Sequence, residues 1–304
     1  MADLQQIVAK LETIILGKPQ QLRLAVACML GRGHLLIEDL PGMGKTTLAE
    51  ALAHVMGLAY QRVQFTSDML PADIIGISIF NPQEQRFEFR AGPIFTQVLL
   101  ADEINRTSPK TQSALLEAME EGQVTTDGVS RKLPLPFFVI ATQNPMTQAG
   151  TFPLPESQLD RFFMRIELGY PDPKAERELM TGRDRRLLLA ELKPLATGEE
   201  LAAWQAAVRT IHVSDAVLDY IQRLVKHTRT SPDFPHGLSP RATLALMRAA
   251  QAWTLLDGRK FVMPEDVQVV LAPVAEHRLR GSVEHQGRAH SLTAKLLTAV
   301  DILA

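Results

Sequence analysis

The sequence has few of the features that would place it among secreted or membrane proteins. Cys28 is the single cysteine among 304 residues, so no disulfide can form within the chain. It lies in the apolar pattern AVACML, and we expect a buried thiol rather than a reactive one. No apolar run approaches the roughly 18 residues of a membrane span. The first residues, MADLQQIVAKLE, lack the basic-then-apolar pattern of a signal peptide. These absences predict a cytoplasmic protein with no membrane span.

An excess of charge of either sign is also missing. Lys and Arg total 32 against 34 Asp and Glu, a formal net charge of −2, which gives no general attraction to nucleic acid or to an anionic membrane. We find no internal repeat and no low-complexity segment. What the chain does have is 46% hydrophobic residues, enough for a substantial core, and a length that favours about two domains.

The most informative stretch is HLLIEDLPGMGKTTLAEAL, residues 34–52. An apolar run, a Gly-rich turn and a helical pattern follow one another, which predicts a strand, a phosphate-binding loop and a helix. Backbone N–H groups in such a turn and at the helix N-terminus point at an anion. Gly42 and Gly44 would let the backbone approach the phosphates, Lys45 would pair with the β and γ phosphates, and Thr46 would bind Mg²⁺. Asp39 stands where the general consensus has Gly.

Polar side chains follow two further apolar runs. FTQVLLA, residues 95–101, is typical of a strand buried on both faces and ends at Asp102 and Glu103. In a nucleotide site Asp102 would orient Mg²⁺ through its water, and Glu103 would activate the attacking water. FFVIA, residues 137–141, leads to Asn144, which could hydrogen-bond that water or the γ-phosphate. An amide at a strand end can equally be a simple cap or turn former.

The pattern along the chain predicts an α/β fold with a parallel sheet over residues 1–170, followed by an all-helical part over residues 171–304. Two β-hairpins interrupt the α/β alternation, at about 70–95 and 123–136, and the first could be a surface ornament or a substrate-contacting loop. Strand patterns vanish after residue 174. The expected helices there are 175–189, 199–211, 215–228, 240–256, 264–278 and 291–303.

The motifs LPGMGKT, VLLADEINR, ATQNP, PESQLDRF and GLSPRA occur in the order found in AAA+ ATPases, and the chain resembles the MoxR family in particular, from about residue 15 to about residue 280. Asp39 agrees with the EDLPGMGKT form of that family. The resemblance implies a P-loop AAA+ core with a helical lid, an ATPase using ATP and Mg²⁺, and a sensor role for Asn144. It places nucleotide contacts at Ile15, Gly17, Asp39, Pro41, Gly42, Met43, Gly44, Lys45, Thr46, Thr47 and Asp102, with Thr46 and Asp102 serving the metal.

The same resemblance assigns three arginines. Arg161 looks like the arginine finger that reaches the nucleotide of a neighbouring subunit, although pairing with a surface acid is its plain alternative. Arg241 looks like the second sensor. Directly after Pro240 it places a cation at the positive end of a helix dipole, and only a nearby anion would make that favourable. Arg106, just past Glu103, is a further candidate for a contact between subunits.

Several other positions have plainer interpretations. Lys18 stands where related sequences often have Gln, which leaves base recognition open, and Ile15 and Gly17 could be a core residue and a helix end. His277 and Arg278, in AEHRL, could suggest a metal or catalytic site. With no second ligand at suitable spacing, we expect a packing or surface role for them in the lid.

The resemblance also implies partners. It predicts a homo-oligomeric ring, with six as the expected number of subunits, in which both hairpins face the central pore. The work expected of it is chaperone-like maturation, assembly or metal or cofactor insertion in a client enzyme complex, alongside a protein with a von Willebrand factor A domain. Two alternatives stay open: a helicase-type DNA motor, weakly supported by Arg131 and Lys132, and a nucleotide-gated scaffold with little turnover. The overall charge argues against nucleic acid.

Overall fold

A parallel five-stranded sheet lies at the centre of the computed structural model, which describes residues 3–144, 151–234, 236–280 and 291–302. The strand order is β2-β5-β8-β1-β9. The strands are β1 (Leu35–Glu38), β2 (Tyr60–Gln64), β5 (Val98–Asp102), β8 (Phe138–Gln143) and β9 (Met164–Ile166). Because all five run in one direction, their carboxyl ends share one edge of the sheet.

The continuous apolar runs of the central strands are explained by burial on both faces. Leu35 and Ile37 of β1 join one hydrophobic cluster, whereas Leu36 between them points into a second cluster on the opposite face. On the first face pack α1 (Leu4–Glu12), α2 (Pro19–Leu30) and α3 (Lys45–Val55). On the second lie α4 (Pro71–Ile75), α5 (Pro109–Glu121) and α6 (Glu156–Leu159). Cys28 of α2 is fully buried, as predicted.

Local sequence signals account for the limits of α5. Ser108 caps its N-terminus by accepting a hydrogen bond from the N–H of Thr111, and Pro109 occupies the first helical position. The helix ends at Gly122, whose φ of 63° is left-handed. The predicted start and stop of this helix are therefore confirmed.

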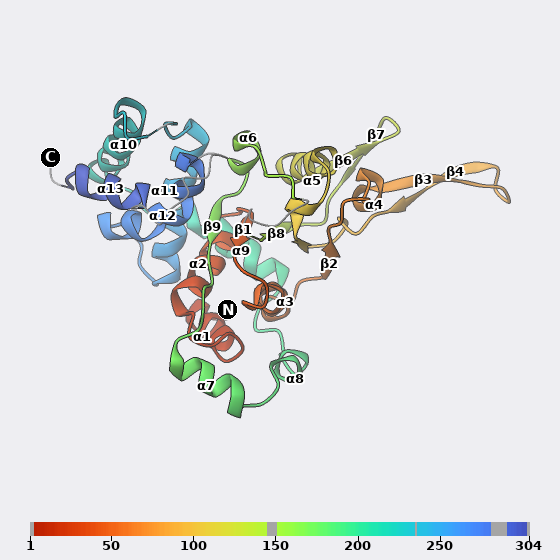
Figure 1. Cartoon of the computed structure of the whole chain (residues 1–304), viewed down its shortest axis with the longest axis horizontal. Coiled ribbons are helices and arrows are strands. Elements are labelled where there is room, and N and C mark those ends of the chain that lie inside the picture. The colour runs from red at the N-terminus through yellow and green to blue at the C-terminus, as the bar shows by residue number, and fades with distance from the viewer. Residues whose placement is uncertain (1–2, 145–150, 235, 281–290, 303–304) are drawn as a thin grey trace.

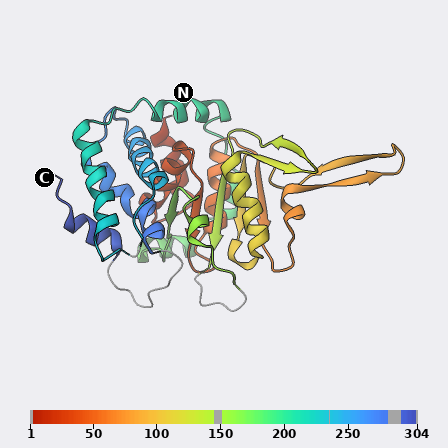
Figure 2. The same ribbon diagram turned by 90° about the horizontal axis from the view of Figure 1, so that it is seen from above.

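Both predicted hairpins are present. They are β3 (Gly76–Asn81) with β4 (Arg86–Ala91), and β6 (Gln123–Thr126) with β7 (Val129–Lys132). Asp127 and Gly128 connect the second pair with positive φ values of 53° and 74°, as the Asp-Gly signal predicts. The two hairpins project from the end of the sheet opposite to the C-terminal helices (Figures 1 and 2).

The C-terminal part is all-helical, as predicted. Its helices are α7 (Pro173–Thr181), α8 (Arg185–Ala190), α9 (Gly198–Val208), α10 (Asp215–Thr230), α11 (Pro240–Leu256), α12 (Pro264–Arg280) and α13 (Leu292–Ala299). The single helix expected over 175–189 was wrong. The chain is extended at Gly182, where an added Cβ would lie 2.6 Å from the Glu178 carbonyl, and two helices form.

The lid helices do not form a separate core. Leu246 of α11 and Val270 of α12 belong to the same hydrophobic cluster as Leu35 of β1. The division at residue 170 therefore stays a prediction. No helix in the described part of the chain is both long and apolar enough to span a bilayer.

Candidate nucleotide-binding site

The Gly-rich loop joins the end of β1 to the start of α3. Gly42 and Gly44 have φ values of 85° and 87°, and an added Cβ at either would meet nothing within 4 Å. Glycine is thus needed for the backbone conformation, and open space lies beside it. Gly44 is the N-cap of α3 and has no side chain to cap its first N–H groups, which leaves them for an anion. Pro41 is exposed, and Met43, Thr46 and Thr47 are partly exposed around this space.

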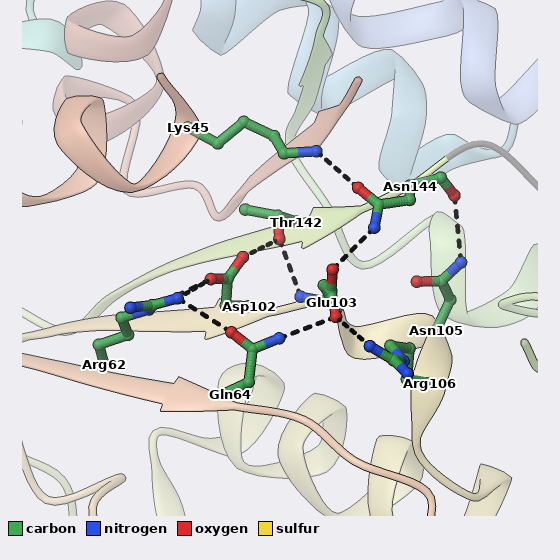
Figure 3. A network of polar contacts seen from close by, with 9 residues as sticks. All are labelled: Lys45, Arg62, Gln64, Asp102, Glu103, Asn105, Arg106, Thr142 and Asn144. Atoms are coloured by element: carbon green, nitrogen blue, oxygen red, sulfur yellow. Dashed lines mark hydrogen bonds and ion pairs between the residues drawn. The ribbon is translucent and has the colours of Figure 1, made fainter. Parts of the chain in front are cut away.

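Lys45 extends from α3 across the loop. Its Nζ donates to Oδ1 of Asn144 at 2.9 Å (Figure 3). It also donates to the carbonyl of Asp39. Burial lowers the pKa of Lys45, and the negative charges of Asp39 and Asp102 oppose that shift. The side chain is 7% exposed, so this cation is held ready at the loop with little competition from water.

The contacts of Asp39 explain why this position has an aspartate in place of the consensus glycine. Its Oδ2 accepts hydrogen bonds from the N–H groups of Leu168 (2.7 Å) and Gly169 (2.6 Å), and its Oδ1 accepts from Leu40 N–H. The carboxylate therefore ties the loop to the chain just after β9. A glycine could not supply this link.

Asp102 is the last residue of β5 and is 6% exposed. Its Oδ1 accepts from the Thr142 hydroxyl at 2.5 Å, and its Oδ2 accepts from Arg62 Nη2 at 2.7 Å. A buried carboxylate needs such partners, because an uncompensated charge would be costly there. Asp102 is thus held at the carboxyl end of β5, where it could orient Mg²⁺ through a water.

Glu103 follows in the left-handed conformation, with φ 58° and ψ 49°. That conformation is unusual for a residue with a side chain, and such residues gather at functional sites. Oε1 of Glu103 accepts from Asn144 Nδ2 at 2.8 Å, and Oε2 accepts from Gln64 Nε2 and Arg106 Nη1, both at 2.9 Å (Figure 3). Arg106, considered above for an intersubunit contact, is thus paired with Glu103 of its own chain.

Asn144 connects the two halves of the site. It accepts from Lys45, donates to Glu103, and its own carbonyl accepts from Asn105 Nδ2 at 3.1 Å. It is 4% exposed. The structure therefore brings together Lys45, Asp102, Glu103 and Asn144 at the carboxyl edge of the sheet.

Arg62, Gln64 and Thr142 were not predicted as site residues from the sequence. Gln64 pairs in register with Asp102, because β2 lies directly beside β5. Thr142 belongs to β8, which ends two residues past the predicted run. The polar residue Gln64 at the end of β2 was the available signal, but its use requires the strand order.

Arg161 and Arg241 meet on one carboxylate. Arg161 Nε lies 3.2 Å from Oε2 of Glu120, and Arg241 Nη2 contacts Oε1 of the same residue. The surface-acid pairing considered for Arg161 is therefore present in the single chain. Glu120 is also the anion that offsets the unfavourable position of Arg241 at the N-terminus of α11.

Gly17 and Lys18 lie against the start of α7 and the chain that leads into it. Ile15 is 8% exposed within the main hydrophobic cluster. Gly17 has φ 70°, and an added Cβ would lie 2.8 Å from Cβ of Ala175. Lys18 donates through Nζ to the carbonyl of Tyr170. These contacts explain the residues structurally, and their role towards adenine stays a prediction.

His277 is buried, with Nε2 3.3 Å from the carbonyl of Phe162. Within the described ranges no group of three or more His, Cys, Asp or Glu side chains could hold a metal ion. The packing role expected for His277 agrees with this position.

Comparisons with known proteins fit this geometry. Residues 34–164 match the ATPase family associated with various cellular activities (AAA), and residues 226–296 match the AAA lid domain. The chain is 42% identical to the uncharacterized protein YeaC of Bacillus subtilis, covering 98% of this chain and 94% of that protein. It is 39% identical to the chaperone MoxR1 of Mycobacterium tuberculosis, covering 91% and 75%. A crystal structure of a candidate ATPase from Cytophaga hutchinsonii is 34% identical, with a TM-score of 0.86 over 98% of this chain and 94% of that one. The chain is an ATP-hydrolysing enzyme and belongs to the MoxR family of AAA ATPases.

Proposed function

We propose that the chain is an Mg²⁺-dependent ATPase that works in a ring of identical subunits, six being the number we expect, and drives maturation of a partner protein complex. The observation that carries the proposal is the continuous hydrogen-bonded series from Lys45 through Asn144 to Glu103 (Figure 3). It links the phosphate loop, the end of β8 and the end of β5. A change in the contacts of Lys45 with the phosphates would therefore be transmitted through Asn144 to the carboxylate of Glu103.

In the proposed reaction each side chain has one task. The N–H groups of the loop and of the first turn of α3 hold the phosphates, and Lys45 pairs with the β and γ phosphates. Glu103 accepts a proton from the attacking water, and Asn144 orients that water. Thr46 and Asp102 offer the hydroxyl and carboxylate oxygens that Mg²⁺ prefers. When bound, the ion would neutralise charge developing on the phosphates.

We assign Arg161 to the nucleotide of a neighbouring subunit. Its pair with Glu120 is partly exposed, with the two side chains 29% and 34% exposed, and such pairs contribute about 0–1 kcal/mol. Exchanging Glu120 for a phosphate would therefore cost little. In other phosphate-transferring systems an arginine of this kind supplies ~10³–10⁵ in rate.

The hairpins are the proposed contact with the client. Exposed apolar side chains gather on them, namely Ile77 (51%), Ile79 (40%), Phe80 (49%), Phe87 (71%) and Val129 (50%). A groove of about 760 Å³ lies between the hairpins and α4, lined in part by Leu70 and Ile75. Exposed apolar patches of this kind commonly mark protein interaction sites. We infer a client protein complex and a partner with a von Willebrand factor A domain.

A DNA motor is less well supported. The guanidinium of Arg131 stacks on the Phe89 ring, 3.8 Å from its centroid, and donates to the Thr126 hydroxyl at 2.8 Å. This cation is therefore engaged within the protein. Binding carried by phosphate contacts would weaken steeply with salt, and salt-dependent capture of DNA would favour the motor over the chaperone.

The test of the proposal compares Lys45→Ala and Glu103→Gln with the wild type. We expect Lys45→Ala to lose ATP affinity, because the buried cation at the loop is gone, and Glu103→Gln to bind ATP and stall. Fluorescent-nucleotide binding and phosphate release measure the two effects, with the exposed Lys10→Ala of α1 as a matched control. Unchanged ATP affinity in Lys45→Ala would refute its phosphate role, and normal turnover in Glu103→Gln would remove it as the base.

The same variants test the client assignment. ATP-loaded Glu103→Gln is used for affinity capture from the native cell, with Lys45→Ala as the non-binding control. Enrichment of a cofactor-dependent enzyme or of a von Willebrand-type protein supports the chaperone. Wild-type protein that binds ATP but releases no phosphate, with or without added Mg²⁺, would favour the nucleotide-gated scaffold.

A further inference from the structure

Arg278 is a buried cation of α12 that the proposed reaction does not use. Its side chain is 5% exposed, and its Nε donates to Oδ1 of Asp160 at 2.7 Å. Its two other nitrogens donate to carbonyls: Nη2 to Phe162 (2.7 Å) and Asp160 (3.2 Å), and Nη1 to Phe163 (3.3 Å) and Val274. The guanidinium is thus surrounded by acceptors, nearly all of them in one short segment, residues 160–163.

That segment contains Arg161. It lies between the end of α6 and the start of β9, so its carbonyls have no regular helix or sheet partners of their own. Arg278 binds the carbonyl before Arg161, in Asp160, and the carbonyl after it, in Phe162. His277 lies 3.3 Å from the Phe162 carbonyl as well. The backbone on both sides of Arg161 is therefore fixed to α12.

A second lid helix reaches the same point. Ser239, the N-cap of α11, donates through its hydroxyl to Oδ2 of Asp160 at 3.1 Å and accepts from the N–H of Ala242 at 3.0 Å. One carboxylate oxygen of Asp160 therefore accepts a hydrogen bond from Arg278 of α12, and the other accepts one from Ser239 of α11. Any displacement of α11 and α12 would pull on the residue that precedes Arg161.

A purely structural ion pair would not need this pattern. A buried pair can often be replaced by apolar side chains without loss of stability. Here the planar fork of arginine serves a carboxylate and several carbonyls at once, which a lysine could not do. The contacts hold an irregular segment in one place rather than joining two helices.

We propose that Arg278 is a positioning residue that, through Asp160 and the carbonyls on both sides of Arg161, makes the orientation of the lid decide where Arg161 points. This inference rests on the proposed function, in which Arg161 acts on the nucleotide of the neighbouring subunit. The lid of one subunit thereby controls hydrolysis in the next.

The test uses Arg278→Lys, which keeps the charge and most of the volume but loses the fork. We expect KM for ATP to stay near that of the wild type and kcat to fall roughly 10²-fold, the effect of a misplacement of about 1 Å. Arg259→Lys is the matched control, since Arg259 is a lid arginine paired with Asp266 away from this segment. We expect it to keep wild-type kcat.

Mixing subunits separates positioning from misfolding. Glu103→Gln is inactive in its own site but carries an intact Arg161 segment, and Arg278→Lys has an intact site but a misplaced Arg161. A mixture of the two should regain turnover, whereas a mixture of Arg278→Lys with Arg161→Ala should not. Failure of the first mixture, or a raised KM in Arg278→Lys, would overturn the positioning role.

Two further results complete the design. If Arg278→Lys does not fold, Asp160→Asn takes its place in the same mixtures, because it removes the shared carboxylate charge with little change in volume. Wild-type kcat in the variant that is used would overturn the inference. Failure of Arg161→Ala to complement Glu103→Gln would instead refute the action of Arg161 between subunits, and this result does not involve Arg278.

Discussion

The side chain of Glu103 is held by donors from three elements: Gln64 on β2, Asn144 after β8 and Arg106 in the 3-10 turn η1 (Ile104–Arg106). A carboxylate held by three charge-assisted or amide bonds is fixed in place, and Oε1, which among the described residues accepts only from Asn144, keeps acceptor capacity for a water. Asn144 also contacts Lys45, so the bond to Asn144 is the one that phosphate binding would disturb first. Under the proposed function, ATP binding would therefore free Glu103 to act as the base.

The buried ring of His34, just before β1, makes the free energy of unfolding depend on pH. Its Nδ1 accepts from Val139 N–H at 3.0 Å and its Nε2 donates to the Met119 carbonyl at 3.1 Å, so the ring is neutral. Burial lowers the pKa of His34 to about 4. The unfolded chain therefore takes up the proton first as pH falls, and stability that is full above pH ~6.5 is lost towards pH 4. We expect this residue to cost about 2 kcal/mol of unfolding free energy between pH 7 and pH 5.

Urea unfolding at the two pH values measures the loss. The control is His34→Gln, whose amide can donate to Met119 and accept from Val139 without titrating. Its stability should change less between pH 7 and pH 5 than that of the wild type. Equal pH dependence in both proteins would contradict the assignment of the loss to His34.

Individual site residues were predictable where they end a strand. Asp102, Glu103 and Asn144 follow apolar runs, and the carboxyl ends of parallel strands share one edge of a sheet. Gln64 and Arg62 were not predictable as site residues, because nothing local in the sequence says that β2 is the neighbour of β5. The partner of Arg161 was predictable only as a class, a surface acid, since Glu120 is distant in the chain.

Residues that cap helices predicted the limits of helices more reliably than apolar periodicity did. Ser108, Pro109 and Gly122 set the limits of α5, and each acts through its own backbone geometry. The periodicity of residues 175–189 continued through Gly182, and one helix was predicted where α7 and α8 form. The backbone is extended at Gly182, and an added Cβ there would lie close to the Glu178 carbonyl. A count of apolar periods registers neither feature.

Gly122 provides the corresponding test. An added Cβ there would meet nothing within 4 Å, so the only penalty of Gly122→Ala is the left-handed backbone at φ 63°. We expect a loss of about 1 kcal/mol in unfolding free energy, because a Cβ disfavours this conformation. Urea unfolding measures it, and Gly122→Asn should lose less, since Asn tolerates the left-handed region. Equal stability of Gly122→Ala and the wild type would mean that the helix end is not held in this conformation in solution.

The lid helices and the two hairpins lie at opposite ends of the sheet (Figures 1 and 2). The lid helices share one hydrophobic cluster with one face of the sheet, so lid and core are mechanically continuous. The hairpins extend from the opposite end (Figure 2), with apolar side chains exposed. Under the proposed function, we expect nucleotide-driven displacement of the lid to reach this projecting surface through the sheet.

Phe80 and Phe87 test this arrangement. They pair across β3 and β4 with ring centroids 5.4 Å apart, and they are 49% and 71% exposed. We expect the double substitution to Thr to leave ATP binding and unstimulated turnover unchanged, because Thr suits a strand and neither ring contacts the nucleotide site. Capture of the client by the ATP-loaded Glu103→Gln form should be lost. The matched control is Met180→Ser, an exposed apolar side chain of α7 (76%) far along the chain from the hairpins. Capture that survives the double substitution would place client recognition elsewhere, and loss of capture in Met180→Ser as well would point to a general effect of surface apolarity.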